Sequence, residues 1–208
     1  MKISEAKDIA GTLGAPSKMP GTAYGISAFA CKTGAKLAQI PGSVCHGCYA
    51  MKGNYTFPNV QGSQAKRLAG ITDQRWVEAM VTLLDKSGET YHRWHDSGDL
   101  QSVEHLAKIV LVAKATPSIN HWLPTREGAT VKQYVDAGGI IPKNLVIRIS
   151  ATMIDGPAPT WWGLTSTVHT VRAPDGARTC PAPTQGNECG DCRACWSPEV
   201  KSVSYHKH

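Results

Sequence analysis

The chain lacks any long run of apolar residues. Its first twenty residues carry charged side chains at Lys2, Glu5, Lys7, Asp8 and Lys18. A signal peptide needs an apolar segment near the N-terminus, and a membrane-spanning helix needs about 20 consecutive, mostly apolar residues. The sequence therefore predicts no signal peptide and no membrane partner, and it favours a reducing cytoplasm, where thiols stay available for metals.

We interpret the sequence as having no cluster of one charge sign, no internal repeat and no low-complexity tract. The chain has 22 Lys and Arg against 16 Asp and Glu, which gives a formal net charge of +6. We interpret the basic residues as scattered over a solvated surface, with a nucleic-acid partner as the weaker alternative. At 208 residues the chain is long enough to bury a core without disulfide bonds.

Seven cysteines are present, and an odd number argues against a closed disulfide framework. Four of them, Cys180, Cys189, Cys192 and Cys195, form the pattern C-P-x7-C-x2-C-x2-C, which Trp196 follows. This spacing, with proline after one cysteine, is typical of a [4Fe–4S] cluster. Zinc also accepts four thiolates, but usually from two separate C-x2-C pairs. We predict a [4Fe–4S] cluster in this tail, with zinc as the alternative metal.

The other three cysteines are Cys31 and the pair Cys45 and Cys48. A C-x2-C pair on a loop of an intracellular protein usually belongs to a metal or redox site. The seven cysteines can therefore supply two clusters, one with four thiolates and one with three. They can also supply a single four-thiolate site with three bystanders, and in that case we favour the tail cysteines, because short loops cost little closure entropy.

The periodicity of apolar residues predicts strands that alternate with helices. Strands are expected at residues 22–30, 90–96, 119–123, 145–150, 165–171 and 200–205, and helices from a cap at Thr72 or Asp73 to Gly88, at 103–115 and at 130–137. Such an order implies βαβ units in a parallel sheet. A complete (βα)8 barrel needs about 250 residues, so we expect a partial (βα) parallel barrel or an open parallel sheet.

The sequence predicts two parts of unequal size. Residues 1–175 are expected to form an α/β core with a cysteine-bearing loop at 31–48, and residues 176–208 a cluster-binding extension packed on that core. Ligands of parallel α/β folds bind at the carboxyl ends of the strands. We therefore expect the cysteine loop to lie beside the polar residues that follow the predicted strands.

Three residues at those strand ends are candidates for catalysis: Asp99, Glu127 and His95. Glu127 or His95 would contact the substrate. Each has a simpler interpretation, since His95 with Asp96 can be a structural pair and Glu127 can pair with Arg126 on the surface. His46 lies inside the cysteine loop, either as a further metal ligand or merely as a neighbour.

Two stretches carry a resemblance to known proteins: P-G-S-V-C-H-G-C-Y-A-M-K-G-N-Y at 41–55 and H-D-S-G-D at 95–99. A cysteine loop after the first strand and S-G-D after the second resemble a radical S-adenosylmethionine (SAM) enzyme. With the C-terminal C-x2-C-x2-C-W, they more narrowly resemble a group of bacteriophage-encoded proteins of unassigned activity, which would place the chain in the host cytoplasm.

The radical SAM resemblance implies roles for residues of this chain. Cys31, Cys45 and Cys48 would hold a [4Fe–4S] cluster with one open iron. The segment Ser97–Gly98–Asp99 would contact the amino group of SAM, and Arg148 and Ser150 its carboxylate and ribose. The tail cluster would then resemble the auxiliary cluster of some superfamily members.

Three functions stay open at this point. The first is a radical SAM enzyme that cleaves SAM to start radical chemistry on an unknown substrate, with an electron donor such as a flavodoxin or a ferredoxin. The second is a non-catalytic [4Fe–4S] or electron-transfer protein with the same fold. The third is a zinc-stabilised interaction module.

Overall fold

The computed structural model describes residues 1–207, in which helices and strands alternate over most of the chain. The strands are β1 (Thr22–Tyr24), β2 (Tyr91–Trp94), β3 (Asn120–Thr125), β4 (Leu145–Ser150), β5 (Thr165–His169), β6 (Arg178–Thr179) and β7 (Ser202–His206). The α-helices are α1 (Ile3–Ala10), α2 (Thr33–Leu37), α3 (Pro58–Gly70), α4 (Trp76–Ser87), α5 (Val103–Ala115) and α6 (Gly128–Asp136). Short 3-10 turns are η1 (Ala28–Ala30), η2 (Tyr49–Met51), η3 (Gly53–Thr56), η4 (Ala182–Thr184) and η5 (Ala194–Trp196).

The strands form one sheet in the order β1-β2-β3-β4-β5-β7-β6, and all of its strand pairs are parallel. Within residues 1–207, β1 and β6 are the two edges and do not pair with each other. The α/β class and the open parallel sheet are thereby confirmed, and the sheet does not close into a barrel. No helix in this part of the chain is both long and apolar enough to cross a membrane.

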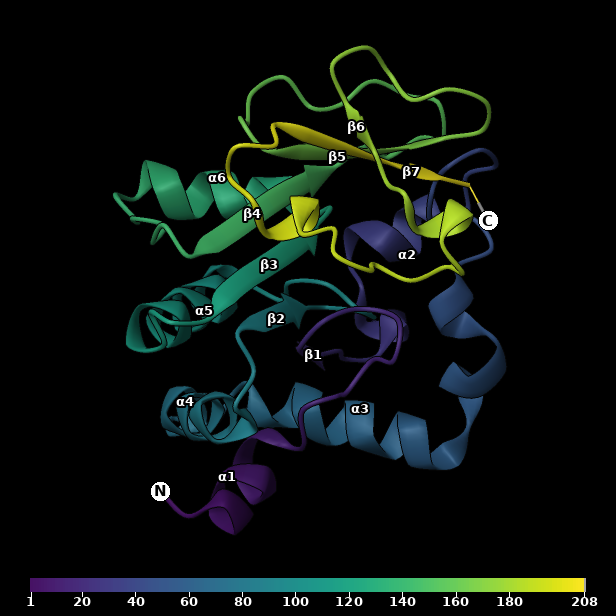
Figure 1. The fold of residues 1–208 in the computed structure, drawn as a ribbon. Helices are drawn as coiled ribbons and strands as arrows, with labels where there is room; N and C mark the ends of the chain where they lie inside the picture. The colour runs from purple at the N-terminus through teal and green to yellow at the C-terminus, as the bar shows by residue number, and fades with distance from the viewer. Residues whose placement is uncertain (208) are drawn as a thin grey trace.

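The sheet is covered differently on its two faces (Figure 1). Helices α4, α5 and α6 pack along one face, and α1 packs behind α4. The C-terminal tail crosses the other face, where η5 contacts β3 and β4. The main apolar core lies between the helices and the sheet, and its buried side chains include Trp76, Trp94, Leu106, Leu123 and Ile147.

Several elements follow directly from local sequence signals. The hydroxyl of Ser102 accepts a hydrogen bond from the His105 amide and caps α5, as its position before an apolar run predicts. Gly88 has φ 72° and ends α4 in the left-handed region that glycine favours. The predicted spans 103–115 and 145–150 match α5 and β4.

Other elements differ from the expectation. Helices α1 and α3 were not predicted, and the first strand is limited to Thr22–Tyr24, because the chain turns into η1 under a cap from Ser27. The last strand, β7, lies between β5 and β6, so the end of the chain is built into the sheet.

Candidate functional site

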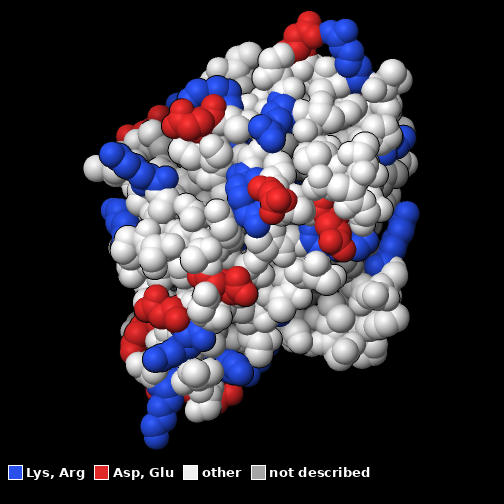
Figure 2. Space-filling model, viewed as in Figure 1, with Lys and Arg blue, Asp and Glu red and all other residues white. Residues whose placement is uncertain are grey.

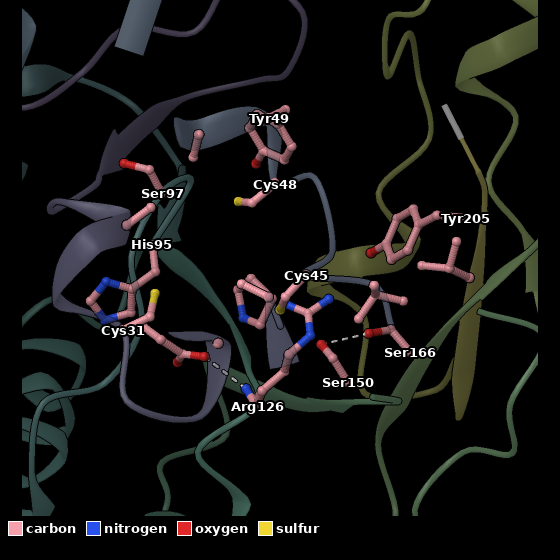
Figure 3. A pocket seen from close by; sticks show the side chains of 18 of the residues that line it. Cys31, Cys45, Cys48, Tyr49, His95, Ser97, Arg126, Ser150, Ser166 and Tyr205 are labelled. Carbon is pink, nitrogen blue, oxygen red and sulfur yellow. Dashed lines mark hydrogen bonds between the residues drawn. The ribbon is translucent and has the colours of Figure 1, made fainter. Parts of the chain in front are cut away.

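A cavity of about 590 Å³ opens at the carboxyl ends of the strands (Figure 3). Its walls come from the segments that follow β1, β2 and β3 and from the ends of β4, β5 and β7. Of the predicted site residues, the cavity is lined by Cys31, Cys45, Cys48, His95, Ser97, Gly98, Asp99 and Ser150. The tail cysteines, Glu127 and Arg148 are not part of this lining.

The three N-terminal cysteines lie around this cavity, although helix α2 separates Cys31 from the other two along the chain. A Cβ atom on Gly34 would lie 3.5 Å from the Sγ of Cys31 and 3.7 Å from the Sγ of Cys45. Two thiols therefore converge on a space that any larger residue at position 34 would fill. Figure 3 shows Cys48 on the adjoining wall.

Two of these thiols, those of Cys31 and Cys45, have raised pKa values, which favours their neutral form. Burial, aided by the negative charge of Asp99, raises the pKa of Cys31 to about 12. Burial also raises the pKa of Cys45, while the nearby Arg126 guanidinium opposes that rise. Because metals bind thiolates, uptake of a metal here would release protons.

The segment after β2 is held in place by side-chain contacts. The Ser97 hydroxyl donates to the Ile26 carbonyl oxygen (2.8 Å) and accepts from the Gln64 amide (2.9 Å). Gly98 has φ 78°, and a Cβ there would lie 2.4 Å from the Cγ1 of Ile26. Only glycine satisfies both this backbone conformation and this packing, so the S-G-D turn is rigidly placed at the cavity wall.

Asp99 ties the end of β2 to the end of β3. Its Oδ1 accepts hydrogen bonds from the Thr125 hydroxyl (2.5 Å) and the Leu100 amide (2.8 Å), and its Oδ2 accepts from the Arg126 amide (2.8 Å). Burial raises its pKa to about 6, against the lowering effect of these hydrogen bonds. The main role of the Asp99 carboxylate is therefore to hold the Arg126 backbone in position.

Five cavity residues carry buried polar side-chain atoms without a hydrogen-bond partner: Arg93, His95, Asp96, Trp122 and Arg126. Buried polar groups are nearly always paired, because an unpaired one costs about 1–3 kcal/mol. A concentration of such atoms around one cavity is the arrangement expected of a binding site for a polar ligand.

His95 is the most unusual of these residues. Its backbone φ is 58°, a value that residues other than glycine seldom adopt, and within residues 1–207 neither ring nitrogen has a hydrogen-bond partner. Burial lowers the pKa of His95 well below its ordinary value, so its ring is neutral at pH 7. Strained, unpaired side chains of this kind cluster at functional sites.

Glu127 and Ser150 have structural partners near the cavity. The Glu127 carboxylate accepts from the amide (2.7 Å) and the hydroxyl (2.8 Å) of Thr33, and thereby anchors the segment that carries Cys31. Its predicted pairing with Arg126 is absent from the ion pairs formed within residues 1–207. The Ser150 hydroxyl accepts from Ser166 (3.0 Å) at the ends of β4 and β5.

Arg148 lies away from the cavity, on the face of β4 that the tail covers. Its guanidinium donates to six backbone carbonyl oxygens, those of Thr165, Ala194, Cys195, Ser197, Val200 and Lys201. These bonds use all of its N–H donors. Arg148 therefore has no donor left for the ligand carboxylate that the sequence led us to expect. Arg148 instead fixes the backbone around Cys195.

The tail cysteines lie near one another, next to the carbonyl oxygens that Arg148 contacts. Burial raises the pKa of Cys195 to about 11, although a hydrogen bond from Tyr205 and the charge of Arg148 oppose this; the charge of Cys180 adds to it. Burial likewise raises the pKa of Cys189, with further contributions from Cys180 and Cys192. The Tyr205 oxygen lies 3.1 Å from the Sγ of Cys195.

No group of three or more His, Cys, Asp or Glu side chains in residues 1–207 is arranged to hold a metal ion. A tetrahedral zinc site needs four thiolates gathered at about 2.3 Å from one ion. A cubane cluster keeps its thiolates farther apart, because each binds a different iron atom. The two metals therefore need different spacings of the same four thiolates.

Sequence reasoning missed Arg93, Trp122 and Tyr205 as cavity residues. Arg93 lies over the Trp122 ring, 4.7 Å from its centroid, and both come from the middle of strands on the face that the tail covers. The sequence signal that could have identified Arg93 as a cavity residue is the position of an arginine inside a predicted strand. Tyr205 reaches the cavity only because β7 inserts beside β5, which no local pattern indicates.

Comparison with known proteins gives one match. The family model described as gene product 88 matches residues 2–198. No curated protein and no solved structure matches the chain.

Proposed function

The chain belongs to the gene product 88 family, and we propose that it is an iron–sulfur protein of the radical SAM kind. The observation that carries this proposal is the single cavity that brings Cys31, Cys45 and Cys48 together with five unpaired polar side chains. Its position at the carboxyl ends of a parallel sheet is where such folds bind ligands.

The residues around the cavity fit a [4Fe–4S] cluster held by three thiolates. Cys31 and Cys45 converge over Gly34, where the lack of a side chain leaves room. Three protein ligands leave one iron atom free for an outside ligand. When bound, such a cluster supplies the electron for reductive cleavage of SAM.

Ionic and polar groups beside the cysteines match the functional groups of SAM. Arg126, whose guanidinium points toward Cys45 in Figure 3, and Arg93 are the cations that would bind its carboxylate. The unpaired Oδ1 of Asp96 would accept from its amino group, and the hydroxyls of Ser150 and Ser166 lie where a ribose needs partners. Arg126 thus takes the carboxylate role first expected of Arg148.

The three candidate catalytic residues receive different roles. Asp99 orients Arg126 through its backbone amide, and Glu127 positions the Cys31 segment through Thr33, so both are positioning residues. His95 lines the cavity and both of its ring nitrogens lack a partner, and we assign it to the substrate.

For the tail we propose a second [4Fe–4S] cluster bound by Cys180, Cys189, Cys192 and Cys195. Support comes from the C-x2-C-x2-C spacing and from the carbonyl network of Arg148, which holds the ligand-bearing backbone. Tyr205 contacts both Cys195 and the cavity, so it connects the two centres. A flavodoxin or a ferredoxin remains the kind of electron donor that this arrangement needs.

The direct test is anaerobic incubation of the iron-loaded protein with SAM and dithionite, followed by assay for 5′-deoxyadenosine. We expect product formation, and a raised KM for SAM in Arg126→Met because its carboxylate loses a cation. Arg172→Met is the matched control, since Arg172 pairs with Asp175 on the exposed surface. A fully loaded protein that forms no product would contradict the enzyme and leave the non-catalytic iron–sulfur protein.

A further inference from the structure

Positive charge is distributed unevenly along the chain. No Asp or Glu occurs between Asp8 and Asp73, whereas this segment contains six basic residues: Lys18, Lys32, Lys36, Lys52, Lys66 and Arg67. Their charge equals the formal net charge of the whole chain, +6, so the rest of the molecule is balanced. The segment is also the one that carries the cavity cysteines.

The middle of this segment, from Ala28 to Met51, lines the cavity. Helix α2 contacts η1, η1 contacts η2, and η2 contacts η3. Lys36 on α2 and Lys52 next to η2 are exposed, and neither takes part in an ion pair within residues 1–207. Lys and Arg side chains stand along the right edge of Figure 2, the side toward which β3 and β4 run in Figure 1, while the face in view mixes both signs.

Large aromatic side chains are exposed on the same turns. Phe29 is 61% exposed, Tyr49 59% and Phe57 52%. Tyr49 also lines the cavity, and its hydroxyl donates to the Asp96 carbonyl oxygen (2.7 Å), which fixes the ring at the mouth. Singly scattered apolar side chains need no partner, but these three rings lie on or next to turns that contact one another.

We propose that these five residues, Phe29, Lys36, Tyr49, Lys52 and Phe57, form a basic rim that binds single-stranded nucleic acid across the cavity mouth. Sites for single strands combine cationic side chains that follow the phosphates with aromatic rings on which bases stack. Protein interfaces are instead depleted in lysine and enriched in arginine. The pairing of lysines with aromatic rings therefore favours a nucleic acid over an acidic protein.

Fluorescence anisotropy of a fluorescein-labelled DNA single strand of about 20 nucleotides tests the basic rim. Binding should weaken with salt between about 50 and 200 mM, with a slope of log K against log salt of about −0.7 per phosphate contacted. K36E/K52E should weaken binding about tenfold or more by that electrostatic contribution. The matched control K114E/K143E makes the same charge change at exposed lysines near the amino ends of β3 and β4 and should change affinity less than about twofold.

Stacking is tested separately with F29A/F57A, which should weaken binding about fivefold or more without changing the salt slope. Equal losses in the rim and control charge variants would overturn the proposal, as would a duplex that binds as tightly as the single strand. So would an acidic protein that binds the rim while the strand does not. Protein that binds the strand but forms no 5′-deoxyadenosine refutes the proposed enzyme alone, and the reverse result refutes the basic rim alone.

Discussion

The two groups of cysteines in this chain lie in different electrostatic surroundings. The cavity cysteines have neighbours of both signs, since Asp99 and Glu127 add to the burial that raises the pKa of Cys31, whereas Arg126 opposes the rise in the pKa of Cys45. The tail cysteines have basic neighbours, since Arg148 and Arg93 oppose the rise in the pKa of Cys195. Each added thiolate makes an iron–sulfur centre one charge more negative. A centre with four thiolates therefore gains more from neighbouring cations than a centre with three.

The backbones of the two groups differ as well. The tail is fixed by five hydrogen bonds from one buried guanidinium, whereas the cavity cysteines lie on turns joined by a few side-chain contacts such as that of Glu127 with Thr33. We infer that the tail cysteines hold their metal centre permanently, whereas the cavity allows a ligand to bind and leave. The predictions below test this contrast.

The largest effect is expected from removing ligands. C45A/C48A should reduce 5′-deoxyadenosine formation to background, keep the tail iron and leave folding nearly intact. C192A/C195A should lose about four iron atoms per chain and a large part of the stability, because metal binding there is coupled to folding. Iron analysis and urea denaturation measure both, and equal stability losses in the two variants would break the contrast.

The next effect concerns the carbonyl network. Arg148→Met should lower the free energy of unfolding by about 3 kcal/mol or more, because six buried or partly buried acceptors lose a charged donor. Arg172→Met, at an exposed pair, should change it by about 0.5 kcal/mol or less. If Arg148→Met altered SAM affinity while stability stayed the same, the original ligand role would be restored.

A smaller effect is expected from pH in the metal-free protein. The pKa of Asp99 is raised from 3.8 to about 6 on folding, so the folded state binds this proton more tightly than the unfolded chain does. The free energy of unfolding should therefore fall as pH rises from about 4 to about 6, by up to about 3 kcal/mol, and stay level above. Asp99→Asn should flatten this profile in urea titrations; an unchanged profile would show that another group titrates.

The smallest effect is a shift of potential. Tyr205→Phe removes the hydroxyl 3.1 Å from the Sγ of Cys195, and hydrogen bonds to cluster sulfur raise the reduction potential. The tail centre should become harder to reduce while the cavity centre stays unchanged, as measured by potentiometric titration. A shift confined to the cavity centre would contradict the assignment of Tyr205.

Local patterns predicted the elements that depend on neighbours in sequence. The Ser102 cap, the Gly88 stop, helix α5 and strand β4 are of this type. Helix α3 was missed because Gly62, Ser63 and several polar residues weaken its apolar stripe. The gathering of Cys31, Cys45 and Cys48 was expected from the position of strand ends, and these residues do line one cavity.

What failed depended on contacts between distant segments. Alternation along L-V-I-R-I-S indicates that Arg148 faces away from Ile147 and Ile149, but not that the tail lies on that face. Tyr205 and Arg93 likewise meet the cavity through strand order alone. The uneven distribution of basic and acidic residues along the chain can be seen in the sequence, but a net charge summed over the whole chain does not reveal it.

The most direct test of the central claim is the EPR spectrum of dithionite-reduced C192A/C195A protein before and after addition of SAM. That variant retains only the cavity cysteines as a set, so its spectrum isolates the centre in question. We predict a [4Fe–4S] signal whose g-values shift when SAM binds the open iron. A variant that is still folded but lacks that signal, or gives a signal that SAM leaves unchanged, would contradict the account.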